Sequence, residues 1–183
     1  MQLKEHIAYG GAASVVLAPF FGAKTLLFFL ASVLIDSDHY LDYLYYSGFK
    51  NWSVKTMFRF HGTMAAWRNK PDICALEAFH TAEFLGALGA CALLFHSMEL
   101  SLIFWGMIFH MGLDLIRLSQ WKRVDLRALS FTEYWVRKKR MMVRGVNPET
   151  IFEEAYRTVS QEPRTVSSSS SARETPEIAP ALF

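Results

Sequence analysis

The stretch VLIDSDHYLDYLYY, residues 33–46, places ionisable side chains directly after an apolar run. FFLASVLI ends at Asp36, and Asp38, His39 and Asp42 follow closely. An acidic cluster at a helix end is usually just solvated, but carboxylates are disfavoured near a helix C-terminus, where these residues are expected to lie. Ionisable residues bordering membrane-like segments are costly and usually functional, so the stretch is either a solvated helix end or one half of a metal site whose other ligands lie elsewhere in the chain.

The chain of 183 residues has an apolar front and a polar back. Residues 7–35 contain one fully charged side chain, Lys24, and residues 84–113 contain one, Glu99. The clean apolar runs are shorter than the about 20 residues of a spanning helix, so a soluble all-helical bundle is an alternative. Aromatic residues near the segment ends favour the membrane interpretation.

The pattern predicts an all-α fold, a four-helix membrane-embedded bundle built from two helical hairpins. Pro19 and Gly22 interrupt the first apolar region, which indicates a turn between two helices. His96 lies at a comparable break in the second region, and we expect it to be a satisfied core histidine. The predicted helices lie near residues 4–20, 24–45, 76–96 and 99–118.

Residues 1–118 are therefore predicted to form a transmembrane domain that carries the metal site. Residues 119–160 are expected to form a basic cytoplasmic helical extension, and residues 161–183 a disordered tail. Within the extension, SFTEYWVRKKRMMVRG (130–145) is interpreted either as a helix lying on anionic lipid or as an ordinary solvated helix.

Basic residues predict the orientation in the membrane. Five lie between the second and third predicted helices and nine follow the fourth, whereas the hairpin tips offer only Lys24. Because basic residues stay cytoplasmic, we expect a multi-pass protein of the cell inner (plasma) membrane with both termini in the cytoplasm.

This topology brings ionisable residues of all four helices to the cytoplasmic side. His80 and Glu83 are spaced i,i+3, and His110 and Asp114 i,i+4, so each pair shares a helix face. Helical bundles build metal sites from such inward-facing pairs. Mixed imidazole and carboxylate ligands favour zinc, with manganese or iron as alternatives. The candidate metal ligands are His6, Asp36, Asp38, His39, His80, Glu83, His110 and Asp114.

His61, in FRFHGTMAAW, is expected to be a loop histidine, with a role behind the metal ligands as the alternative. Asp36 and Asp38 are not separated by the pattern: either can bind metal while the other moves protons.

The order of these motifs resembles the YdjM-like family of bacterial inner-membrane, metal-dependent hydrolases and, more distantly, zinc-dependent phospholipase C. The likeness covers roughly residues 1–118. It implies that Asp36, Asp38 and His39 fall on the family's Pro-Asp-x-Asp-His motif, with Ile35 in place of proline. It also implies that the family's other metal-ligand positions correspond to His6, His80, His110 and Asp114. The family's His-Arg-Gly-x-Thr-His-Ser stretch is absent as such, and His80-Thr81 is the preferred counterpart over His61-Gly62-Thr63.

Three functions follow as hypotheses. The first is a hydrolase in which a divalent metal ion activates water toward a phosphoester or ester, with Asp38 or Glu83 as general base. Its expected partners are membrane lipid and a lipid-like or membrane-associated substrate, not nucleic acid. The second is a non-catalytic membrane protein with a structural metal site. The third, a transporter, is disfavoured because few polar residues continue through the predicted membrane segments.

Overall fold

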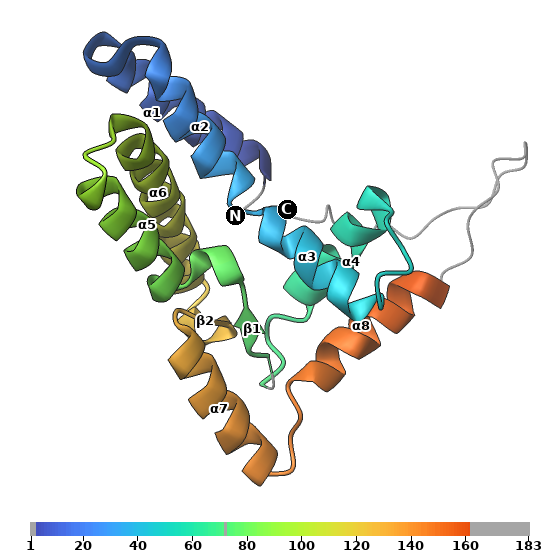
Figure 1. Cartoon of the computed structure of the whole chain (residues 1–183). Helices are drawn as coiled ribbons and strands as arrows, with labels where there is room; N and C mark the ends of the chain where they lie inside the picture. Colours follow the sequence, from blue (N-terminus) through green and yellow to red (C-terminus); the bar gives the residue numbers. More distant parts are fainter. Residues whose placement is uncertain (1–2, 72, 162–183) are drawn as a thin grey trace, which may run out of the picture.

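A computed structural model of the chain describes residues 3–71 and 73–161 and shows a mostly helical protein (Figure 1). The predicted tail beyond Gln161 lies outside the described residues. The elements are α1 (Leu3–Phe21), η1 (Gly22–Lys24), α2 (Thr25–Leu34), α3 (Ser37–Tyr46), α4 (Val54–Ala66), β1 (Ala75–Leu76), η2 (Ala78–His80), α5 (Ala82–Leu94), α6 (Met98–Gln120), η3 (Val124–Leu126), β2 (Arg127–Ala128), α7 (Phe131–Val143) and α8 (Glu149–Gln161).

Helices α1, α2, α5 and α6 form what we call the apolar bundle. α2 packs between α1 and α6, and α5 packs against α6. Gly22, with a φ of 59°, makes the turn between α1 and α2, as the sequence predicts. The two hairpin tips meet, because Lys24 Nζ lies 2.7 Å from Glu99 Oε1. Two hairpins side by side are therefore present.

Two stretches, Leu3–Tyr46 (α1 to α3) and α6, are long and apolar enough to cross a membrane. α5 is apolar but has only 13 residues. The four spanning helices that the sequence predicts are thus reduced to two candidates by length and composition, and core helices of soluble proteins meet the same criterion.

The second lobe consists of α3, α4 and α8, which pack together beside the bundle (Figure 1). The apolar face of α8 contacts both α3 and α4, so the predicted extension folds back onto the front of the chain. The buried core of this lobe consists of Tyr43, Leu44, Phe60, Ile73, Ile151, Phe152, Ala155 and Val159.

A short parallel pairing of β1 and β2 lies at the junction of the bundle and the second lobe. Ala75 pairs with Arg127 and Leu76 with Ala128. The Ala82 amide extends the pairing by donating a hydrogen bond to the Leu129 carbonyl, at 2.8 Å. This pairing holds the segment before α5 beside the segment after α6.

Three expected boundaries are wrong. The predicted helix 24–45 ends at Leu34, and a new helix begins at Ser37, so Asp36 and Asp38 lie at a helix N-terminus rather than a C-terminus. The predicted helix 76–96 begins only at Ala82, after β1 and η2. The predicted basic loop contains α4, whose first turn is capped by Ser53 Oγ accepting from the Thr56 amide.

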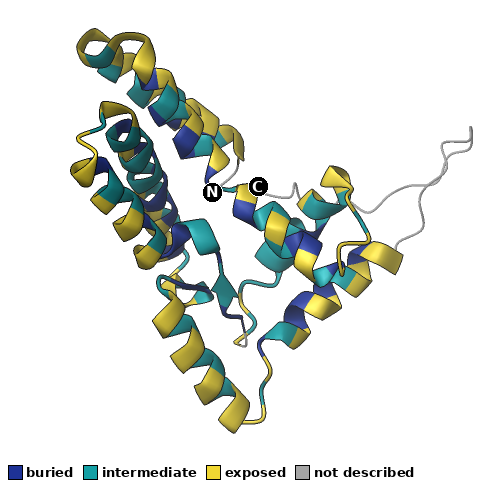
Figure 2. Ribbon diagram, viewed as in Figure 1, coloured by how far each residue is buried: buried dark blue, intermediate teal, exposed yellow. Residues whose placement is uncertain are grey.

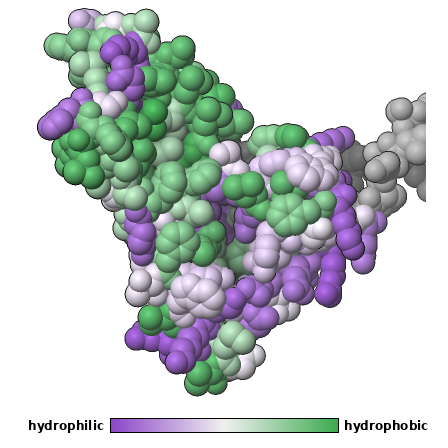
Figure 3. Space-filling view, in the orientation of Figure 1, coloured by the Kyte–Doolittle hydropathy of each residue, from purple (hydrophilic) through white to green (hydrophobic). Residues whose placement is uncertain are grey.

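The exposure and the polarity of the surface side chains differ between the apolar bundle and the rest of the molecule. Exposed residues cover the outer surface of the apolar bundle and most of α7 (Figure 2). Apolar side chains gather over the bundle, and hydrophilic ones gather over the second lobe and α7 (Figure 3). His96 is exposed at a hairpin tip with a φ of 48°, so its expected place in the core is wrong.

Candidate metal centre

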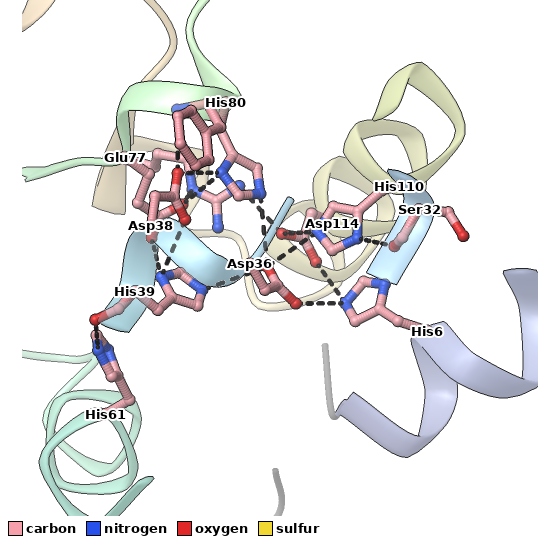
Figure 4. A network of polar contacts seen from close by, with 12 residues as sticks. His6, Ser32, Asp36, Asp38, His39, His61, Glu77, His80, His110 and Asp114 are labelled. Carbon is pink, nitrogen blue, oxygen red and sulfur yellow. Dashed lines mark hydrogen bonds and ion pairs between the residues drawn. The ribbon is translucent and has the colours of Figure 1, made fainter. Parts of the chain in front are cut away.

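Four side chains converge where the bundle meets the second lobe (Figure 4). Asp36 comes from the turn between α2 and α3, His80 from η2, and His110 and Asp114 from one face of α6. One ligand atom from each lies within 4.8 Å of the others. We call this set the inner centre. Its members come from three segments far apart in the chain.

The spacing of these atoms fits a shared metal ion. Two ligands of a tetrahedral zinc ion at 2.0–2.1 Å lie about 3.3 Å apart. Asp36 Oδ1 lies 3.1 Å from His110 Nε2 and 3.6 Å from His80 Nε2. Asp114 Oδ2 lies 3.5 Å from His110 Nε2. These three distances lie on both sides of the value expected between two ligands of a tetrahedral zinc ion.

The hydrogen bonds of the two histidines fix which nitrogen faces the centre. His110 Nδ1 lies 2.7 Å from the Ser32 carbonyl oxygen, which can only accept, so Nδ1 carries the proton. His80 Nδ1 likewise donates to Asp38 Oδ2, at 2.8 Å. In the neutral imidazoles, both Nε2 lone pairs therefore face inward, as metal-ligating histidines require.

Three inward-facing atoms are buried and have no hydrogen-bond partner among the described residues: Asp36 Oδ1, His80 Nε2 and His110 Nε2. Buried polar groups without a partner are costly, and native proteins rarely retain them. Asp36 occupies the N-cap position of α3, yet its side chain makes no capping hydrogen bond. A bound cation would satisfy all three atoms at once.

His6 adds a fifth group from α1. Its side chain is 1% exposed, and Nε2 lies 3.3 Å from Asp114 Oδ1 and 4.0 Å from Asp36 Oδ2. Its ring stacks on that of His110 with centroids 3.9 Å apart. The structure thus places His6 against the inner centre, where it contacts the two carboxylates.

Asp38 lies behind His80 as seen from the inner centre, and His39 lies beside Asp36 (Figure 4). Asp38 Oδ2 accepts from the Phe79 amide at 3.1 Å in addition to His80, so it orients that histidine. His39 turns Nε2 toward Asp36 Oδ1, at 3.5 Å. The structure therefore gives Asp36 and Asp38 different positions: Asp36 faces the inner centre, and Asp38 supports a ligand.

Glu83 does not join the site. Because α5 begins at Ala82, Glu83 lies in its first turn and points to the start of α7, where it accepts from the Phe131 amide at 3.2 Å. His80 belongs to η2 rather than to that helix, so the shared-face argument for the pair does not hold. The predicted roles of Glu83 as ligand and general base have no geometric support in the described structure.

Two residues of the site were not predicted. Arg127 contacts Glu77 Oε2 through Nε, and its Nη1 lies 3.0 Å from Asp114 Oδ2. Burial alone would lower the pKa of Arg127, but Glu77 and Asp114 raise it, so the guanidinium stays charged. The two-residue pairing of β1 with β2 brings these residues together, and so short a strand has no periodicity that a sequence can reveal.

His61 supports the site from α4. Its Nε2 donates to the main-chain oxygen of His39, at 2.7 Å. Burial and the neighbouring His39 lower the pKa of His61 to about 3, so it remains neutral near pH 7. The position behind the ligands, rather than a plain loop histidine, is the interpretation that the structure favours.

The electrostatics of His80 reflect competing influences. Burial and Arg127 act to lower its pKa, but the hydrogen bond to Asp38 and the nearby carboxylates of Asp36 and Glu77 outweigh them, so the pKa of His80 is raised. A proton and a metal ion thus compete for the same imidazole nitrogen.

The inner centre is not closed on all sides. The Asp36 side chain is 19% exposed and that of His39 27%, whereas His80, His110 and Asp114 are almost completely buried. The inner centre is therefore exposed to its surroundings only on the side of Asp36 and His39, within the described part of the chain.

Comparison of the chain with protein-family models, with curated proteins and with solved structures gives no match.

Proposed function

We propose that the protein is a membrane-bound, metal-dependent hydrolase that acts on a phosphoester or ester of a lipid or membrane-associated substrate. The observation that carries the proposal is the convergence of Asp36 Oδ1, His80 Nε2 and His110 Nε2, which are buried, preoriented and without hydrogen-bond partners in the described part of the chain. The sequence resemblance to the YdjM-like family supports the same activity.

The surface of the apolar bundle supports the membrane location. Large apolar side chains near the hairpin tips are 69–78% exposed, far more than a protein in water normally leaves uncovered in one area. Lipid tails would cover them. These residues are Val15, Val16, Phe20, Leu93, Leu94 and Phe95.

The charge distribution supports a cytoplasmic position for the metal centre. The tips, with Lys24 and Glu99, lie at one end of the bundle, and the second lobe and the basic α7 lie at the other (Figure 1). Because basic segments remain on the cytoplasmic side, the centre would lie near the cytoplasmic leaflet of the inner membrane. A substrate anchored in that leaflet can reach the side of Asp36 and His39.

The chemistry follows from the ligand set. A divalent cation held by Asp36, His80, His110 and Asp114, zinc being favoured, supplies Lewis acidity that polarises a phosphoryl or acyl oxygen and activates water. The protein's own groups keep that centre ready. Ser32 and Asp38 hold the histidine tautomers, and Arg127 offsets the charge of Asp114.

The test measures metal content and hydrolysis together. Detergent-purified wild-type protein is expected to contain a stoichiometric transition metal and to cleave a chromogenic phosphodiester or carboxylic ester. His110→Ala combined with Asp114→Ala should lose the inner-centre metal and lower the rate by roughly 100-fold or more, since metal activation is worth several kcal/mol. Glu83→Gln, a carboxylate outside the site, is the matched control and should retain both properties. Metal-free wild-type protein, or full activity of the double variant, would overturn the proposal.

One observation favours a second function, a structural metal site without turnover. Four protein ligands already complete a tetrahedral zinc site, and structural sites are closed in this way. Replacement of zinc by cobalt separates the two functions: a four-coordinate spectrum that does not change with added inhibitory anions indicates a closed, structural site, and a five- or six-coordinate spectrum indicates an open one.

A further inference from the structure

Three polar side chains form a second group next to the inner centre, with two of them beyond His80 and His39 reaching back to Asp36 (Figure 4). They are Asp38 and His39 from the first turn of α3 and Glu77 from the segment that follows β1. His39 Nδ1 lies 3.4 Å from Glu77 Oε1 and 3.9 Å from Asp38 Oδ1. We call these three residues the outer cluster.

The outer cluster contains buried atoms that the protein leaves without hydrogen bonds. Asp38 is 3% and Glu77 9% exposed. Asp38 Oδ1, His39 Nδ1 and Glu77 Oε2 have no hydrogen-bond partner within the described residues, although Arg127 forms an ion pair with Glu77 Oε2. Asp38 uses its other oxygen for His80 and Phe79, so Oδ1 is directed at His39 alone.

Charge balance indicates that one cation is too few for this region. Four buried or nearly buried carboxylates, those of Asp36, Asp38, Glu77 and Asp114, face one guanidinium, that of Arg127. With neutral histidines, a divalent ion in the inner centre leaves one negative charge without compensation. Buried charges without compensation are destabilising, so a second cation beside Asp38 and Glu77 would stabilise the region.

The ring of His39 presents one nitrogen to each of the two groups of carboxylates. Its Nε2 lies 3.5 Å from Asp36 Oδ1, and its Nδ1 lies between the two carboxylates of the outer cluster. An unprotonated Nδ1 at this position can serve as a metal ligand beside Asp38 and Glu77. The main chain of His39 is held in this position by His61. One histidine nitrogen and two carboxylate oxygens at such separations are a normal ligand set for zinc or manganese.

We propose that Asp38 Oδ1, His39 Nδ1 and Glu77 Oε1 form a second divalent-cation site, separated from the inner centre by the ring of His80. His39 connects the two sites, because its Nε2 lies 3.5 Å from Asp36 Oδ1 of the inner centre. The outer site does not depend on the hydrolase activity, so it can be tested by metal binding alone.

The test counts zinc ions. Metal-depleted full-length protein in detergent is dialysed against a zinc buffer, and bound zinc per chain is measured by elemental analysis. Wild-type protein is expected to hold two ions, and Glu77→Gln and His39→Ala one each. Glu83→Gln, the same chemical change outside the cluster, should keep two. His110→Ala combined with Asp114→Ala should also fall to one, because the outer site remains.

The outcomes separate this inference from the proposed function. One ion in wild-type protein overturns the outer site and leaves the inner centre intact, whereas no ion overturns both. Two ions that persist in both Glu77→Gln and His39→Ala identify the second as adventitious and also overturn the outer site. If Glu77→Gln loses both ions because the pairing with Arg127 is broken, His39→Ala decides: one ion supports the outer site, and two refute it.

Discussion

Replacing Gly106 by alanine tests how tightly the packing of α2 against α6 controls the metal centre. A Cβ at Gly106 would lie 3.1 Å from Ala31 Cβ and well under 3.0 Å from the Phe28 carbonyl oxygen, whereas ordinary contact begins at 3.4 Å. A packed interface does not yield elastically, so α2 would have to retreat from α6 by about 1 Å. Overpacking of this size costs about 1–3 kcal/mol of stability.

The same displacement reaches the ligands. His110 lies one turn after Gly106, and Ser32 lies one turn after Phe28, so the 2.7 Å hydrogen bond between His110 Nδ1 and the Ser32 oxygen would lengthen. Loss of such a supporting hydrogen bond weakens metal binding by about 10–100-fold. We therefore expect Gly106→Ala to raise the zinc Kd by that factor and to lower the unfolding temperature.

The assay is competition with a chromogenic zinc chelator, combined with a thermal unfolding scan in the same detergent. Gly112→Ala is a matched control on the same helix, because a Cβ there meets nothing within 4 Å. It should leave the zinc Kd unchanged and stabilise the helix by about 0.5–1 kcal/mol. Gly106→Ala with the zinc Kd and unfolding temperature of the wild type would refute the reasoning.

Three further predictions concern the surroundings of the centre. Asp38→Asn should weaken zinc binding by about 10–100-fold without unfolding the protein, because it removes the charged acceptor of the His80 hydrogen bond. Asp125→Asn, at an exposed carboxylate, is the control. A zinc Kd equal to that of the wild type in the chelator competition assay would contradict this prediction. Because the pKa of His61 is depressed to about 3, its stabilising contribution is complete above pH 6.5 and is lost as the pH falls toward 3, by up to about 1.4 kcal/mol per pH unit. His61→Gln should therefore flatten unfolding free energy between pH 6.5 and 5, and an unchanged slope in denaturant titrations would count against a neutral buried imidazole. Phe152→Ala should destabilise the second lobe by about 3–5 kcal/mol and expose α8 to limited proteolysis, and wild-type resistance would show that α8 does not pack on α3 and α4.

The sequence predicts the parts of this structure that depend on long, regular patterns. The hairpin turn at Gly22 and the placement of His110 and Asp114 on one face of α6 follow from turn residues and helical spacing. The predicted order and orientation of the helices place His6, Asp36, His80, His110 and Asp114 at the same end of the bundle. The structure brings these five residues together.

Other parts depend on tertiary contacts that local pattern does not contain. The break between Leu34 and Ser37 has neither proline nor glycine, and its only sequence signal is Asp36, a residue type that favours the N-cap position. That break decides that Asp36 faces the inner centre while Asp38 lies behind His80, a choice that the motif leaves open. Glu77 and Arg127 meet only because two dipeptides pair as strands. The expected partner Glu83 is lost because the helix begins after His80.

Residues that contact one another at the metal centre lie far apart in the sequence, so they leave the ribosome at different times. Both carboxylate oxygens of Glu5 on α1 accept hydrogen bonds from Arg117 on α6, which lies 112 residues later in the chain. The residues of the metal centre span a similar separation in sequence. Contacts so distant in sequence form late, because the entropy of closing a long loop must be overcome first. A nascent chain that has already placed α1 and α2 therefore exposes His6 and Asp36 without their partners until α6 emerges. A metal ion that binds at the inner centre is therefore expected to be acquired after α6 has been synthesised, in a step that completes the fold rather than one that starts it.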